Sequence, residues 1–225
     1  MPTFTERGPV QYVVVFLTLW ALGIVFSKAL KVRYQRSTLS VRELVPERAD
    51  FVLSPATVDT VLKRLEALCD DPDRFVLFHR VQVALSNLRN MGQIGDVEQV
   101  LNAQADADED VIASSHTLLN GILWAVPVLG FIGTVQGLSA AIGRFGSILS
   151  GAQELSAIQP ALREVTAGLA TAFDTTLVAL IAAVTIHFLS VGVRKGEEEL
   201  LDGCRSYCQR HVVGRLRLRP LEDAP

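Results

Sequence analysis

The chain has 225 residues, of which 49% are hydrophobic and 20% are charged. This balance excludes an intrinsically disordered protein, because enough apolar surface is available for burial. The formal net charge of −3 offers no excess of positive charge for a nucleic-acid partner. Its three cysteines are an odd number at irregular spacing, which argues against a disulfide framework.

Apolar residues concentrate in three runs, at residues 10–30, 118–145 and 167–193. Each run is near or above the roughly 18–20 residues that cross a bilayer as a helix. The sequence therefore predicts an all-α integral membrane protein with three transmembrane helices, extended by long cytoplasmic helices and without β-sheet.

Basic residues fix the predicted orientation. Lys28, Lys31 and Arg33 follow the first run, whereas a signal peptide carries its positive charge before the apolar stretch. The end of the first span and the end of the third, at Arg194 and Lys195, are therefore predicted to be cytoplasmic. The predicted layout is an outer N-terminus (1–9), span 10–30, cytoplasmic insertion 31–117, span 118–145, outer loop 146–166, span 167–193 and cytoplasmic tail 194–225.

The insertion is predicted to consist of helical hairpins. Ser54 with Pro55, and Asp71 before a second proline, are typical of helix starts. From Asp96 no strong helix breaker occurs before Gly121, which predicts a soluble helix that runs directly into the second span.

Two apparent metal motifs are rejected. The acidic residues 106–110 resemble the start of a calcium loop, but Val111 and Thr117 stand where Gly and Glu are required, so a solvated helix face is favoured. Cys204, Cys208 and His211 lack a fourth ligand for a tetrahedral zinc site. We therefore predict no metal and no cofactor.

The second span carries a stripe of small residues. Gly130, Thr134, Gly137 and Ala141 fall on one helical face, and Gly133 lies beside it. Small residues let membrane helices approach closely, so the three glycines are predicted to pack against another helix. The Thr134 hydroxyl is predicted either to bond its own backbone or to line a polar path.

The third span contains an acid, Asp174, among threonines. A carboxylate at membrane depth costs roughly 2.5–3.5 kcal/mol even on lenient scales, so such residues usually mark an ion path. Thr171, Asp174 and Thr175 lie within about one third of the helix circumference, while Thr176 lies roughly opposite. The alternative reading is a buried structural acid, and threonines that only bond backbone carbonyls.

The segments "PVLGFIGTVQGL" and "GLATAFDTTLVALIAAV" resemble the MotA/TolQ/ExbB proton-channel family, as does the layout of three spans around a large helical insertion. Three spans resemble the TolQ and ExbB members in particular. The resemblance implies a bacterial inner-membrane protein with a periplasmic N-terminus and a cytoplasmic C-terminus. It also implies a homopentamer around a dimer of a single-span partner similar to ExbD, TolR or MotB.

By position, Thr134 and Thr176 match the threonines of the family's two pore-forming helices. Where ExbB-like members carry a glutamate, this chain has Thr171, and an acid appears one turn later at Asp174. Because residues i and i+3 share a helix face, Asp174 is in a position to replace that carboxylate.

We therefore expect a channel (stator) subunit of a motor driven by the proton motive force, with an ion path formed by Asp174, Thr134, Thr176, Thr171 and Thr175. No enzymatic bond chemistry is expected. The alternative is a non-conducting helical scaffold that anchors an envelope complex.

Overall fold

The computed structural model describes residues 9–39, 44–45, 53–54, 57–69, 71–91, 94–151 and 158–216. The predicted helix start at Pro55 lies outside these residues. Within the described part, the chain divides into two compact units. We call the part within residues 1–27 and 116–192 the membrane unit, and the part within 28–115 and 193–225 the insertion unit.

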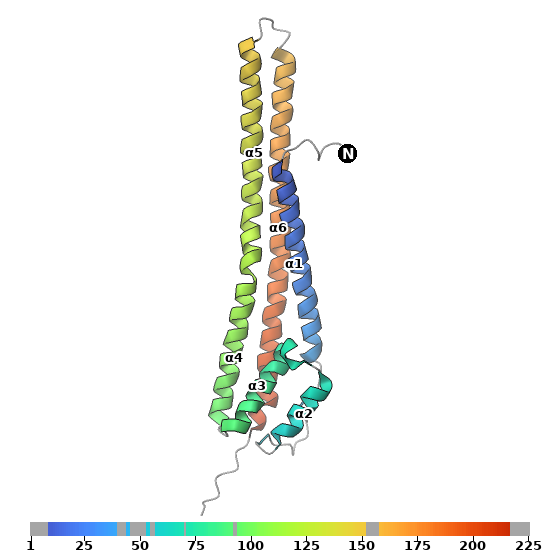
Figure 1. The fold of residues 1–225 in the computed structure, drawn as a ribbon, viewed down its shortest axis with the longest axis vertical. Helices are drawn as coiled ribbons and strands as arrows, with labels where there is room; N and C mark the ends of the chain where they lie inside the picture. The colour runs from blue at the N-terminus through green and yellow to red at the C-terminus, as the bar shows by residue number, and fades with distance from the viewer. Residues whose placement is uncertain are drawn as a thin grey trace, which may run out of the picture. The chain divides into compact units, whose positions relative to one another are not determined.

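The membrane unit is formed by three long helices, α1 (Pro9–Leu39), α5 (Thr117–Gly151) and α6 (Ile158–His211), shown in Figure 1. All three are long and apolar enough to cross a membrane. Helices α1 and α6 continue beyond this unit into the insertion unit. The prediction of an all-α membrane protein with three spanning helices is confirmed.

Small residues lie in the helix contacts of the membrane unit, together with a few larger buried ones. Ala21 and Ala179 are fully buried, and so are Val126 and Ile186. Many other large apolar side chains point outward: Trp124 is 73% exposed and Phe188 is 71% exposed. Such a surface is unfavourable in water and is suited to lipid, where close packing of small residues holds helices together.

The insertion unit is built from shorter helices around a conventional core. It contains α2 (Val58–Leu68), η1 (Pro72–Arg74), α3 (Val76–Met91), α4 (Ile94–Ser115) and η3 (Val213–Arg215) together with the ends of α1 and α6. Large apolar residues such as Leu65, Leu77 and Leu85 are at most 1% exposed. Within the described residues there is no strand, and Leu53 and Leu216 form an isolated bridge.

Helix α3 begins later than its sequence predicts. Asp71 and the following proline open the 3-10 turn η1, and the α-helix starts at Val76. The reason is a distant cap: the Gln35 side chain accepts from the Val76 N–H at 3.1 Å and donates to the Arg74 carbonyl at 2.6 Å. A side chain of α1 thus satisfies backbone groups that the local sequence leaves open.

The predicted continuous helix from Asp96 is interrupted at one residue, because α4 ends at Ser115 and α5 begins at Thr117. The Ser114 hydroxyl donates to Val111 O at 3.0 Å and the Ser115 hydroxyl to Ile112 O at 2.6 Å. Serine hydroxyls that bond nearby carbonyls compete with the helical backbone, which accounts for the interruption.

One acid of the predicted solvated face is partly buried. The Asp108 side chain is 19% exposed and accepts from Arg80 Nε at 2.6 Å, and Arg80 itself is 2% exposed. Asp106 and Glu109 are 73% and 56% exposed and follow the prediction. The solvated-face interpretation is therefore wrong for Asp108, because a buried cation requires an anionic neighbour.

Cys204 and Cys208 belong to the core of the insertion unit. Burial raises the pKa of the Cys204 thiol to about 11 and that of Cys208 to about 12, although the positive charge of Arg80 acts in the opposite direction. Both thiols stay protonated at neutral pH and contribute to the core as small apolar groups.

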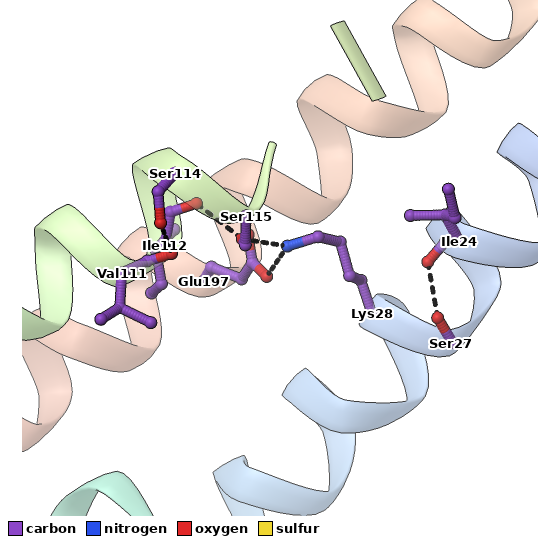
Figure 2. A network of polar contacts seen from close by, with 8 residues as sticks. All are labelled: Ile24, Ser27, Lys28, Val111, Ile112, Ser114, Ser115 and Glu197. Atoms are coloured by element: carbon purple, nitrogen blue, oxygen red, sulfur yellow. Dashed lines mark hydrogen bonds and ion pairs between the residues drawn. The ribbon is translucent and has the colours of Figure 1, made fainter. Parts of the chain in front are cut away.

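A buried ion pair joins three helices of the insertion unit (Figure 2). Lys28 Nζ on α1 lies 2.9 Å from Glu197 Oε1 on α6 and donates to Ser115 Oγ at 2.6 Å on α4. The two charged side chains are 14% and 9% exposed. A pair this buried is costly to break, because the remaining charge loses the opposite charge beside it.

Candidate functional site

Helices α5 and α6 approach each other through small residues. A Cβ atom added to Gly130 would lie 2.6 Å from Ala179 Cβ, and one added to Gly137 would lie 2.7 Å from Ala172 Cβ. Real Cβ atoms do not approach other atoms so closely, so glycine is required at both positions for this helix separation.

Gly133 lies where the three membrane helices meet. A Cβ atom there would be 3.2 Å from Thr175 Cγ2 on α6 and 3.6 Å from Val10 Cγ1 on α1. The glycine therefore leaves room for α1 and α6 to contact α5 at the same point.

The close approach of α5 and α6 brings two threonines together. The hydroxyl groups of Thr134 and Thr176 form a direct hydrogen bond in which either atom can donate. The Thr176 hydroxyl also lies 2.7 Å from Gly130 O, and the Thr134 hydroxyl lies 3.3 Å from both Gly130 O and Ala172 O. Each hydroxyl thus has alternative acceptors, so the donor order of the pair is reversible.

A third polar contact joins α1 to α6. Gln11 Nε2 donates to the Thr175 hydroxyl at 2.8 Å, and the Thr175 hydroxyl donates to Thr171 O at 3.0 Å. Gln11 and Thr175 are 9% and 6% exposed. Sequence reasoning missed Gln11, although an amide near the start of an apolar run is the kind of signal that marks a polar helix contact.

Thr171 is half-buried, and its hydroxyl donates to its own helix at Ala167 O, 3.0 Å away. Its side chain therefore makes the hydrogen bond to its own helix backbone that threonines commonly make in membrane helices.

Asp174 lies on the exposed face of α6, turned away from the seam of Ala172 and Ala179. Its neighbours one and two turns along this face, Val178 and Ile181, are 48% and 58% exposed. Carboxylates are unfavourable against lipid, so in the membrane this face needs cover from protein or water.

The structure thus divides the predicted path residues into three groups. Thr134 and Thr176 meet between α5 and α6. Thr175 faces α1. Asp174 faces out of the single chain, and Thr171 points in a direction between those of Asp174 and Thr175 around α6. The helical wheel placed Thr176 opposite Asp174, and the contact with Thr134 accounts for that separation.

Among the residues that the structure describes, no group of three or more histidine, cysteine, aspartate or glutamate side chains is placed to hold a metal ion. In the contacts described above, the polar groups that stand close together are hydroxyls, one amide and backbone carbonyls. Such groups are suited to passing or holding a proton by hydrogen bonding.

The chain was compared with known families and proteins. A family model described as "MotA/TolQ/ExbB proton channel family" matches residues 70–202, which is more than half of the 225 residues. The matched range contains Thr134, Asp174 and Thr176, and it begins after α1. No curated protein matches the chain.

Proposed function

The chain belongs to the MotA/TolQ/ExbB proton channel family, and we propose that it is the ring-forming stator subunit of a motor driven by the proton motive force. Members of this family form oligomeric membrane channel complexes. The proposed complex is a pentamer of this chain around a dimer of an ExbD/TolR-like partner with a single span. It lies in the bacterial inner membrane and transmits energy to the cell envelope.

The hydroxyl pair of Thr134 and Thr176 carries this proposal. Both oxygens have alternative hydrogen-bond acceptors on the facing helix. A hydroxyl both donates and accepts, so the pair can pass or hold a proton without a permanent buried charge. The pair lies between Gly130 and Gly137, where α5 and α6 approach closely, and this position suits a narrow path that limits leakage.

Asp174 supplies the charged group of the proposed path. Its place on the outward face of α6 is compatible with a ring in which this face meets the central partner or a neighbouring copy. There the carboxylate alternately binds and releases the proton, and Thr171 and Thr175 on the adjoining turn border it. Thr171 occupies the position of the family's glutamate, so Asp174 takes over its part from one turn further along.

The free energy of proton movement across the membrane is sufficient for such a motor. Moving one elementary charge across 100 mV yields about 2.3 kcal/mol. Each proton that passes the ring therefore supplies enough free energy to shift a packed helix contact by a modest amount, and repeated transfer drives rotation of the partner inside the ring.

The test is reconstitution of the chain with its single-span partner in proteoliposomes. We expect native mass measurement to give five copies of this chain, and an imposed potential to drive proton flux. Thr134→Val and Thr176→Val should each lower the flux strongly, because valine keeps the shape and removes the hydroxyl.

The matched control is Thr18→Val on α1, since the Thr18 hydroxyl donates to Val14 O at 2.7 Å in its own helix. Equal flux from the unaltered chain and from all three threonine variants would show that protons do not pass by way of Thr134 and Thr176. A stable complex without flux from the unaltered chain would support the non-conducting scaffold instead.

A further inference from the structure

The polar contact between α1 and α6 leaves one atom unsatisfied. Gln11 Oε1 is buried and receives no hydrogen bond from the described part of the chain. Its own Nε2 donates to Thr175, and the whole side chain is 9% exposed. An acceptor buried without a donor is destabilising, and more so in a membrane, where water is scarce.

The orientation of the amide follows from Thr175. The Thr175 hydroxyl already donates its single hydrogen to Thr171 O. Its oxygen is therefore left as an acceptor, and only the NH₂ end of Gln11 can bond it. The amide must turn its oxygen away, which is why Oε1 is the atom without a partner.

This contact is not needed to satisfy Thr175. A threonine hydroxyl that donates to the carbonyl four residues earlier is satisfied without a second partner. An apolar side chain at position 11 would pack between the helices without burying an open acceptor. Simple helix packing therefore does not explain an amide at this position.

The contact also lies at the level of the hydroxyl pair. Gly133, which precedes Thr134 on α5, would meet Thr175 and Val10 with an added Cβ atom. Thr175 itself precedes Thr176 on α6. Gln11 thus brings α1 to the layer in which the Thr134 and Thr176 hydroxyls meet.

Both polar contacts converge on one turn of α6. The Thr175 hydroxyl bonds Thr171 O, and the Thr134 hydroxyl lies within hydrogen-bond distance of Ala172 O. Side-chain hydroxyls that share helix carbonyls adjust the local bend of the helix. The turn held in this way carries Asp174.

We propose that Gln11 is a positioning residue of the ion path, acting through Thr175 on the turn of α6 that presents Asp174. The inference rests on the proposed function, because it assigns to α1 a part in the same path. Because Gln11 donates from α1 to the Thr175 oxygen, it makes the geometry at Asp174 depend on the position of α1.

The test is a double-mutant cycle on proton flux through the reconstituted complex, with Gln11→Met and Thr175→Val. We expect each single change to lower the flux by about three- to tenfold, the range that one lost hydrogen bond gives. The double change should lower it no further than the Thr175→Val change alone. Independent, multiplicative effects would overturn the inference, and so would unaltered flux in Gln11→Met.

A second variant separates positioning from packing. In Gln11→Glu, a protonated carboxyl group still donates to Thr175, whereas the ionised form cannot. We expect near-normal flux at low pH and a pH-dependent fall that the unaltered complex lacks, with the same copy number at both pH values. An unchanged pH profile would overturn the inference. If Gln11→Met fails to assemble, the pH profile of Gln11→Glu still tests whether Gln11 positions the turn of α6 that carries Asp174.

The two proposals fail in distinguishable ways. If the unaltered complex conducts protons but the Gln11 variants behave like it, only the role of Gln11 is lost. If the unaltered complex assembles and conducts nothing, the proposed function is lost and this inference with it.

Discussion

The membrane unit and the insertion unit differ in how they use small and large apolar residues. In the membrane unit, glycine and alanine lie where α5 and α6 approach closely, and many large side chains, such as Trp124 and Phe188, face outward. In the insertion unit, leucine and valine are fully buried, and charged groups such as Lys28 and Glu197 are paired. Close approach of small residues holds helices together in lipid, whereas burial of large apolar side chains is the main stabilising contribution in water.

The largest expected effect is the loss of the buried ion pair. Lys28→Met removes the ammonium group that lies 2.9 Å from the buried Glu197 carboxylate, so we expect the insertion unit to lose about 3–5 kcal/mol. Thermal unfolding of the full chain in detergent, followed by circular dichroism, measures this loss. The double variant Lys28→Met/Glu197→Leu should recover most of the stability.

The exposed pair of Arg36 and Glu199 is the matched control, because it spans the same two helices at 2.6 Å with side chains 44% and 53% exposed. Its removal should cost about 0–1 kcal/mol. Equal losses from the two pairs would contradict the assignment of Lys28 and Glu197 to a buried contact.

The next largest effect is expected from truncation of a core side chain in the insertion unit. Leu85→Ala removes a fully buried side chain of the insertion unit and should cost about 2–5 kcal/mol. Leu68→Ala, at a position 52% exposed in the same unit, should cost far less. The same unfolding measurement compares them, and a similar cost for both would mean that the described core does not hold this unit together.

The close contact of α5 and α6 should be weakened when a single methyl group is added at Gly130. Gly130→Ala places a Cβ atom 2.6 Å from Ala179 Cβ, so α5 and α6 must separate, at a cost of about 1–3 kcal/mol. We expect lower thermal stability together with lower proton flux, since the hydroxyl pair is pulled apart.

Gly143→Ala on the same helix tests whether this response is specific, because an added Cβ atom there meets nothing within 4 Å among the residues that the structure describes. Its stability should match that of the unaltered protein. A loss equal to that of Gly130→Ala would show that loss of glycine itself, rather than contact with α6, decides the outcome.

Over a single pH unit, the smallest effect is the one expected at alkaline pH, in the insertion unit alone. Burial raises the pKa of Cys208 from 9.0 to about 12, so the folded state holds this proton more tightly than the unfolded state. The resulting stability is present in full below pH 9 and is lost as the pH rises toward 12, by at most about 1.4 kcal/mol per pH unit for one proton. Cys208→Ala should flatten this dependence in unfolding curves between pH 8 and pH 11, and an unchanged slope would contradict it.

The sequence was sufficient to predict the number of spanning helices and the stripe of small residues, because hydropathy and helical periodicity encode both. Span number follows from apolar length, and the contact of Gly130 and Gly137 with α6 involves the same stripe that the sequence predicts. Family membership was also predicted from the two span motifs and is confirmed by the family match.

Contacts between residues far apart in the chain could not be predicted in this way. Gln11 and Thr175 are separated by 164 positions, and the cap that Gln35 forms on α3 has no local signal. A helical wheel gave the relative directions of Thr176 and Asp174 but not which of them faces α5. Which face meets which neighbour depends on the packing of the whole unit.

The central claim is that protons pass beside the carboxyl group of Asp174 and the hydroxyl groups near it. Its most direct test is proton flux through the complex of this chain with its single-span partner, carrying Asp174→Asn, which keeps the side-chain shape and removes the charge. We expect an assembled complex of the same copy number whose flux is almost abolished. Unchanged flux from that assembled complex would show that protons do not pass by way of Asp174.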